Sequence, residues 1–423
     1  MSYTIKEIKQ GIKVHCIETK KFKTNLMTAV ITLPLNRERV TFNSVIPAVL
    51  KRGTENLKTQ EEIAKKLEEM YGAEFDCGIE KIGDNHVLKF YLETLNDNFI
   101  PKDYKENLTA ESINLLLDII FNPYTENNKF KEEYVEAEKN NIKLLIQAKI
   151  DNKDAYALNS CIEEMYKGKP YGLYKYGYIE DLEKINAQNL YEYYKEIIEK
   201  AKIDIFFSGD INAKEIEQEV EENCKIKELV GRDAKIIVNK EEKQKQEIKN
   251  KEDKMDVTQG KLVIGLDVNY TSEDAKFPIS IYNVILGESA TSKLFQNVRE
   301  KASLAYTARS NYVRQKSNIF IRCGIEIENF DKALEIIKKQ LEDMKNGDFT
   351  EEDLENAKKY MISGITSIQD EQDSEVTYYI GQELSEKFTT FEEYAKKIEE
   401  VSMQDVKDVA NNIDINTIYF LRN

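Results

Sequence analysis

The second half of this chain repeats the order of sequence patterns found in its first half. The strand-like run IDIFFSGD at 203–210 has its counterpart in NTIYFLRN at 416–423. Before each of these runs lies a helical stretch, EDLEKINAQNLYEYYKEII in the first half and EEYAKKIEEVSMQDVKDVANN in the second. Two copies indicate a duplicated domain rather than a solenoid, whose stability needs at least three repeats. We therefore expect the chain to fold as two similar units.

Each copy alternates paired strands with helices. In the first half, AEFDCGIEK and HVLKFYLET flank a turn at 83–85, which predicts an antiparallel hairpin. Apolar side chains at helical spacing between Ile113 and Ile120 then predict an amphipathic helix. Strand pairs interspersed with such helices predict an α+β fold with duplicated halves, each an antiparallel sheet with helices packed on one face.

A highly charged segment separates the two copies. Residues 239–254, NKEEKQKQEIKNKEDK, contain one apolar side chain, Ile248, together with six basic and five acidic residues. Such a segment has too little apolar surface to fold by itself, and its nearly balanced charge is typical of a solvated tether. The predicted organisation is a first domain at 1–238, a linker at 239–254 and a second domain at 255–423.

Composition excludes several classes of function. The net charge of −16 opposes binding to nucleic acid or to an anionic membrane, because both need clustered positive charge. The five cysteines form no C-x-x-C motif, so neither a disulfide framework nor a zinc ribbon is indicated. The N-terminus lacks the apolar core of a signal peptide, and no apolar run is long enough to span a membrane. These features predict a cytoplasmic protein.

The histidines also restrict the chemistry. The chain has only two, His15 and His86, and they fall on separate predicted strands, so a helix with two histidine zinc ligands cannot be built. His86 lies near Asp84 and could form a ligand pair with it, but a histidine at a hairpin is usually structural. No G-x-S-x-G motif and no phosphate-binding loop occur.

A segment of the second half carries residues suited to peptide binding. In LFQNVREKASLAY, which runs from Leu294 to Tyr306, Arg299 and Tyr306 are seven residues apart. A guanidinium can bind a carboxylate or a peptide carbonyl, and a phenol can donate to an oxygen that gains negative charge. A solvated arginine followed by a core tyrosine would give the same pattern.

This segment resembles the substrate-binding segment of the pitrilysin/insulinase family of zinc metallopeptidases, the inverzincins. The flanking apolar residues agree, and so does a loop of the first half that carries Pro170, Gly172, Gly177, Leu182 and Ile185. The resemblance extends from about Met27 to Leu421. It implies the pitrilysin-like fold of two related halves.

The same resemblance identifies what this chain lacks. Catalytic members carry an H-x-x-E-H motif before a Gly-Thr turn, which corresponds here to Gly53 and Thr54. Counting back from that turn places Ser44 and Ala48 at the two histidine positions and Pro47 at the glutamate base. The third zinc ligand, a glutamate seven residues after the position of Glu138, is replaced by Leu145. None of these replacements preserves a strong ligand.

The resemblance therefore implies a noncatalytic chain that binds no metal itself. We expect it to form a heterodimer with a homologous peptidase subunit that carries H-x-x-E-H and the zinc, and to supply Arg299 and Tyr306 to a peptide or small protein substrate. Some chains of this degenerate type are associated with modification of elongation factor P. One alternative is a pure scaffold of the same fold without any role in proteolysis. Another is an enzyme with an unusual site in which Glu138 or other acidic residues surround a metal.

Overall fold

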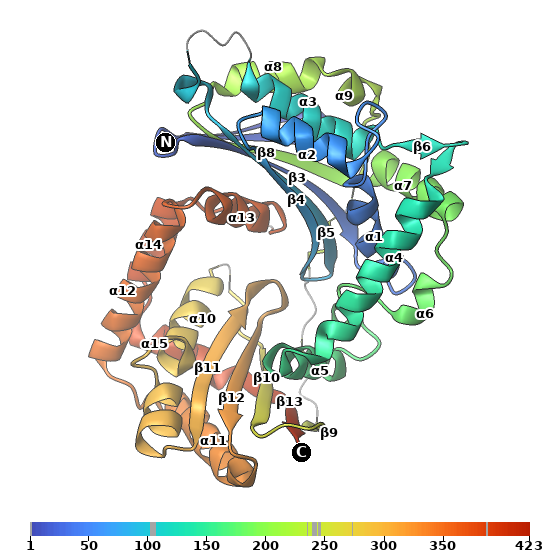
Figure 1. Cartoon of the computed structure of the whole chain (residues 1–423). Coiled ribbons are helices and arrows are strands. Elements are labelled where there is room, and N and C mark those ends of the chain that lie inside the picture. The colour runs from blue at the N-terminus through green and yellow to red at the C-terminus, as the bar shows by residue number, and fades with distance from the viewer. Residues whose placement is uncertain are drawn as a thin grey trace. The chain divides into compact units, whose positions relative to one another are not determined.

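A computed structural model describes residues 2–101, 107–234, 236–238, 243, 247–272, 274–385 and 388–423 (Figure 1). Contacts divide the chain into two compact units. The first consists of Met1–Gln147, Leu173–Ile237 and Asp370–Leu384, and the second of Ala148–Gly172, Val238–Gln369 and Ser385–Asn423. Each unit is built around one large β-sheet.

The first unit contains a six-stranded sheet in the order β1-β2-β8-β3-β5-β4. Neighbouring strands are antiparallel except for the parallel pair β2 and β8. The strands are β1 (Ser2–Lys9), β2 (Ile12–Glu18), β3 (Thr24–Pro34), β4 (Glu74–Ile82), β5 (Asn85–Leu95) and β8 (Lys202–Gly209), and a separate small hairpin pairs β6 (Thr125–Glu126) with β7 (Lys129–Phe130).

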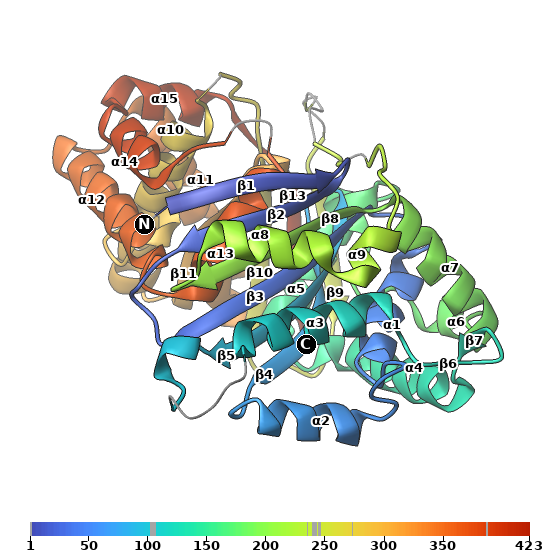
Figure 2. The same ribbon diagram turned by 90° about the horizontal axis from the view of Figure 1, so that it is seen from above.

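Helices cover one face of this sheet. They are α1 (Val40–Leu50), α2 (Gln60–Glu69), α3 (Leu108–Phe121), α4 (Glu132–Gln147), α6 (Ile179–Leu182), α7 (Ala187–Lys200), α8 (Ala213–Glu222) and α9 (Cys224–Glu228). Seen from above, α8 lies over β1 and β2, and α3 lies over β3 and β5 (Figure 2). α2 begins with a capping box formed by Thr59 and Glu62.

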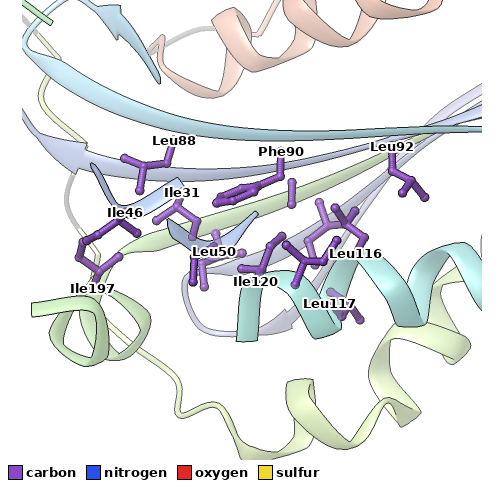
Figure 3. Close-up of a cluster of buried hydrophobic side chains, with 14 of the residues drawn as sticks. Ile31, Ile46, Leu50, Leu88, Phe90, Leu92, Leu116, Leu117, Ile120 and Ile197 are labelled. Atoms are coloured by element: carbon purple, nitrogen blue, oxygen red, sulfur yellow. The ribbon is translucent and has the colours of Figure 1, made fainter. Parts of the chain in front are cut away.

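The core of the first unit lies between the sheet and these helices. Phe90 and Leu88 of β5 point toward Leu50 of α1 and Ile120 of α3 (Figure 3), and all four side chains are buried. Burial of each such side chain contributes about 1.5–3 kcal/mol. Because alternate strand residues face this core, the hairpin β4–β5 and helix α1 are fixed relative to each other.

The second unit contains a five-stranded sheet in the order β11-β12-β10-β13-β9. Its strands are β9 (Lys249–Lys254), β10 (Gly260–Val268), β11 (Ala305–Val313), β12 (Asn318–Ile325) and β13 (Ile413–Arg422). Its helices are α5 (Lys153–Met165), α10 (Lys276–Asn283), α11 (Phe330–Asn346), α12 (Glu351–Ile368), α14 (Phe391–Glu399), α15 (Met403–Asn411) and the π-helices Val284–Glu288 and Phe295–Lys301.

The two sheets confirm the predicted duplication. The order β4-β5-β3-β8-β2 in the first sheet matches β11-β12-β10-β13-β9 in the second, and β1 is an additional edge strand. The final strand of each half, β8 or β13, pairs in parallel with an early strand, β2 or β9. The α+β fold class with antiparallel sheets and packed helices is therefore correct.

The prediction of a linker at 239–254 is wrong at its C-terminal end, because Lys249–Lys254 form β9 and pair in parallel with Thr417–Arg422 of β13. A strand at a sheet edge needs backbone partners more than apolar side chains. Its charges are paired as well: Asp253 accepts a hydrogen bond from Tyr419 (2.7 Å) and Glu252 binds Arg422 (2.7 Å). Residues 239–242 and 244–246 of the predicted linker lie outside the described residues.

Each sheet also carries one helix from the other half of the sequence. α5, at 153–165, packs against β10 and β13 of the second sheet, with Cys161 and Met165 in a cluster that includes Val263 and Tyr419. α13 (Gln372–Glu383) packs against β3 and β8 of the first sheet. The compact units are therefore discontinuous in sequence, whereas the predicted domains, 1–238 and 255–423, are continuous.

Candidate functional site

Four residue positions that the sequence singled out line one pocket of about 290 Å³ in the first unit. Ser44, Pro47 and Ala48 come from α1, and Leu145 comes from α4. α1 packs against α4 and against the hairpin β4–β5. The pocket therefore lies where the resemblance implied a degenerate zinc site.

The α1 side of the pocket offers no metal ligand of useful strength. Pro47 lies inside the helix and has no backbone N–H to donate. The Ser44 hydroxyl is within hydrogen-bonding distance of two backbone carbonyls and donates to them, at 2.8 Å to Thr41 and 3.0 Å to Tyr176. Gly177 follows with φ of +79°, and a Cβ there would lie 2.1 Å from the Thr41 hydroxyl oxygen. Ser44 thus fastens this loop to the helix.

Within the described parts of the chain, Glu138 on α4 is the one acidic residue lining the pocket. It is buried and forms an ion pair with Arg52, and it also accepts a hydrogen bond from the Asn141 amide (3.0 Å). The neighbouring Lys51 is paired with Asp76 at 2.8 Å. Because Glu138 is held by a cation and an amide, it is poorly placed to serve as a base or as a metal ligand. This argues against the unusual metal site around Glu138.

Cys77 on β4 is a lining residue that sequence reasoning did not single out. Its Sγ donates toward the carbonyl of Pro47 (3.2 Å), and burial raises the pKa of the thiol to about 12. A protonated thiol is neither a nucleophile nor a good metal ligand. Leu145 adds only an apolar surface. No group of three metal-ligating side chains lies at this pocket within the described parts of the chain.

His86 is a core residue. It is fully buried on β5, where its Nδ1 lies 3.1 Å from the amide nitrogen of Asn43. Asn43 in turn accepts from the Tyr193 hydroxyl (2.9 Å). Burial lowers the pKa of His86 to about 4, so the ring is neutral near pH 7. The histidine orients α1 on the sheet rather than pairing with Asp84 as a ligand.

The other face of the first sheet carries a charge network that the sequence did not predict. His15, Asp204 and Glu383 bring ligand atoms within 4.8 Å of one another. However, the ammonium of Lys202 contacts both carboxylates, and Lys13 binds Glu383 at 2.9 Å. Burial disfavours the ionised form of each carboxylate. The hydrogen bond from His15 and the charge of Lys202 nevertheless hold the pKa of Asp204 below its usual range, and Lys202 and Lys13 do the same for Glu383. The lysines occupy the place that a metal would need.

Network residues come from strands and a helix that are far apart in sequence, β2, β8 and α13, so no local spacing could have indicated them. The signal available was the presence of charged residues inside otherwise apolar strands, such as Asp204 in IDIFFSGD. Such residues are rarely buried without partners.

Arg299 and Tyr306 lie in the second unit. Arg299 belongs to the π-helix Phe295–Lys301, which packs against β11, and Tyr306 is the second residue of β11. The guanidinium lies over the ring of Phe295 (4.7 Å), and its Nε is 3.7 Å from Glu300. The side chain of Arg299 is 45% exposed and Tyr306 is 64% exposed. Neither residue lines the pocket of the first unit.

Comparisons with known proteins agree with this geometry. Residues 184–361 match the family model described as the peptidase M16 inactive domain. Over the whole chain, 34% of residues are identical to the probable inactive metalloprotease YmfF of Bacillus subtilis, of which 99% is covered. The chain belongs to the M16 peptidases, the pitrilysin/insulinase family.

Other M16 relatives include zinc proteases. The uncharacterized zinc protease YmxG of Bacillus subtilis is 23% identical over 86% of this chain and 83% of its own length. A conserved protein from Enterococcus faecalis V583 has the same fold, with a TM-score of 0.90, 24% identity, and coverage of 100% of this chain and 99% of its own. Among the described helices, none combines the length and apolarity required to cross a bilayer.

Proposed function

We propose that this chain is the noncatalytic, substrate-binding subunit of a two-chain zinc metallopeptidase of the cytoplasm. Its partner is an M16 peptidase that carries H-x-x-E-H and the zinc, and the substrate is a peptide or a small protein. Arg299 and Tyr306 act in trans on the substrate bound at the partner's metal. The chain itself has no hydrolytic activity.

An asymmetry between the two halves carries this proposal. The positions of the metal ligands and the base hold Ser44, Ala48, Leu145 and Pro47, and in the described parts of the chain no group of three metal-ligating side chains lies at the pocket that they line. The second half, in contrast, retains an exposed arginine and an exposed tyrosine at the family spacing. A chain without any role in proteolysis has no chemical reason to keep this pair at its surface.

The two side chains have distinct roles in this proposal. The Tyr306 hydroxyl donates to the oxygen of the scissile carbonyl as it becomes negative, a contribution of about 3–4 kcal/mol for a well-placed donor. Arg299 binds the backbone of the substrate and so acts mainly on its orientation. Zinc and the glutamate base belong to the partner. The occurrence of both an inactive metalloprotease and a zinc protease among the Bacillus subtilis relatives supports a pairing of this kind.

Reconstitution with the partner tests the proposal. The two subunits are mixed, and peptide hydrolysis is measured for wild type, Tyr306→Phe and Arg299→Ala. Tyr306→Phe should lower kcat by roughly 10²- to 10³-fold, and Arg299→Ala should raise KM as well as lower kcat. The matched controls are Tyr360→Phe, at a tyrosine that is 44% exposed in the same unit, and Lys338→Ala at an exposed position of α11.

The controls should leave both constants unchanged. Wild-type turnover by both Arg299 and Tyr306 variants would overturn trans completion and favour a pure scaffold. Full activity of the partner alone would do the same. A stoichiometric zinc ion on this chain after dialysis, together with hydrolysis by the chain alone, would show that the noncatalytic assignment is wrong.

A further inference from the structure

A second pocket, of about 490 Å³, lies in the second unit and is lined by an excess of cations. Its walls come from β11 and β12 and from helices α10, α12 and α14. Among the described residues, four cationic side chains and one carboxylate line it. They are Lys276, Arg309, Arg314 and Arg322, and the carboxylate is Glu288. Arg299 and Tyr306 are not among the lining residues.

Two of these cations lie side by side on neighbouring strands. Arg309 of β11 and Arg322 of β12 are register partners in the antiparallel pair. Like charges at such positions repel each other and are destabilising. A single carboxylate, Asp154 at the first turn of α5, binds both guanidiniums, with Arg309 at 3.2 Å. One anion thus neutralises only one of the two positive charges.

Arg314 adds a further positive charge at this pocket. Arg314 forms no ion pair within the described residues. Glu288 accepts a hydrogen bond from Asn283 at 2.6 Å and is not paired with any of the four cations in the described part of the chain. Burial raises the pKa of Glu288, and the hydrogen bond from Asn283 opposes this shift.

Arg322 supplies an independent observation. Its side chain is only 18% exposed, and its Nε is buried. This Nε nevertheless has no hydrogen-bond partner in the part of the chain that the structure describes. An unpaired buried donor on a guanidinium costs about 1–3 kcal/mol or more and calls for an acceptor. Burial and the neighbouring Arg309 also lower the pKa of Arg322, as expected for a cation short of negative partners.

We infer that this pocket binds an oxyanion, either a carboxylate carried by an acidic peptide or a free phosphate-like anion. The inference rests on concentrated positive charge in a protein whose net charge is −16. An excess of cations around one cavity in such a protein lowers stability unless an anion occupies the cavity. Guanidinium groups match planar and tetrahedral oxyanions by paired hydrogen bonds. This site is separate from the residues of the proposed function and does not depend on it.

Titration calorimetry at constant ionic strength tests the inference with two kinds of probe. One is inorganic phosphate, and the other is a pair of hexapeptides that differ only in having glutamate or glutamine side chains. Saturable binding of phosphate or of the glutamate peptide is expected, with weaker binding at high salt. Arg314→Gln should weaken it by roughly five- to twentyfold, because one charged hydrogen-bond donor is lost.

Lys338→Gln is the matched control, because it removes one positive charge from an exposed position of the same unit. It should leave the affinity unchanged. Arg309→Gln provides a second variant, since Arg309 is 58% exposed and Asp154 keeps its contact with Arg322. Phosphate binding would identify a small anion as the ligand, and exclusive binding of the glutamate peptide would identify a carboxylate. Absence of saturable binding, or equal weakening by Arg314→Gln and Lys338→Gln, would overturn the inference.

Discussion

The ion pair of Arg52 and Glu138 shows how structural contacts hold together the pocket between α1 and α4. Replacement of Glu138 by glutamine leaves the partly buried guanidinium of Arg52 without its counterion. We expect the free energy of unfolding to fall by about 1–3 kcal/mol, measured by urea denaturation. Because the loss arises from the unpaired cation, the double variant Arg52→Gln/Glu138→Gln should be more stable than the sum of the single effects implies.

An exposed pair provides the control for this prediction. Lys65 and Glu69 are 4.0 Å apart with both side chains more than half exposed. Glu69→Gln should change stability by less than about 0.5 kcal/mol. Strict additivity of the Arg52 and Glu138 substitutions would show that the two side chains do not stabilise the fold as a pair, and Glu138 would then need another role.

Single residues of the pocket differ in how well the sequence predicts them. The poor zinc-binding capacity of Ser44, Pro47 and Ala48 follows from residue identity alone, since none of these side chains binds zinc strongly. The pairing of the Glu138 carboxylate with Arg52 and Asn141 does not follow from residue identity, because it depends on how α1 and α4 pack together. The location of Cys77 in the pocket depends on how β4 lies against α1, and this too is set by tertiary structure.

Among the elements, α13 makes several polar contacts with the first sheet. The Gln372 amide donates to the carbonyls of Ser208 (2.8 Å) and Thr24 (3.2 Å). Asp373 binds Lys89 at 2.7 Å. Between these anchors and Glu383, the helix buries Glu375 completely, and neither oxygen of this carboxyl has a hydrogen-bond partner in the described part of the chain.

The seating of α13 should therefore depend on pH through Glu375. Burial raises its pKa to about 7, while Lys21 opposes the shift. The seated helix thus binds a proton more tightly than the free helix, and its stabilisation is complete below about pH 4.5 and is lost as the pH rises through about 7. Hydrogen exchange of residues 372–383, corrected for intrinsic rates, should show protection falling by roughly twentyfold between about pH 5.5 and 7.5.

Glu375→Gln should remove this pH dependence, since glutamine stays neutral. Glu371→Gln changes an exposed carboxyl just before the same helix and should leave the pH dependence intact. The other ionisable groups near α13 include Tyr3, Lys13, His15, Lys21, Lys89, Asp370, Asp373, Lys202, Asp204, Glu383 and the N-terminal amino group. An unchanged dependence in Glu375→Gln would assign the titration to one of those groups instead.

Elements differ in how far sequence patterns predict them. The capped helix α2 and the hairpin β4–β5 follow from local signals, a capping box and strand alternation around a turn. The strand β9 gives no such signal, because a charged edge strand looks like a tether until its partner β13 is known. The π-helix that contains Arg299 is likewise invisible in residue periodicity, and such helices often occur at functional sites.

On the scale of the whole molecule, the duplicated halves are not the units that pack. α5 belongs to the first half of the sequence, but its apolar side chains complete a cluster with Val263, Phe320 and Tyr419 of the second sheet. α13 comes from the second half and covers part of the first sheet through Gln372 and Glu383. Sequence repeats reveal the duplication, but they cannot show which sheet each helix covers, since that depends on contacts between distant residues.

This exchange predicts how the chain behaves when it is cut between the halves. We expect limited proteolysis to act first within 239–246, because the segment is rich in charge and glutamine and precedes β9. The two fragments should stay together in size-exclusion chromatography under native conditions, since each supplies a helix to the other's sheet.

A fragment of 1–238 expressed alone lacks α13, and a fragment of 247–423 lacks α5 and exposes the apolar face formed by Val263, Phe320 and Tyr419. Each fragment alone should therefore be less stable and prone to aggregate, whereas coexpression should restore a soluble complex. The control is a cut engineered at the turn 83–85, inside the hairpin β4–β5. Separation of the fragments after cleavage at 239–246, with both remaining folded and monomeric, would show that the exchanged helices contribute little to either unit.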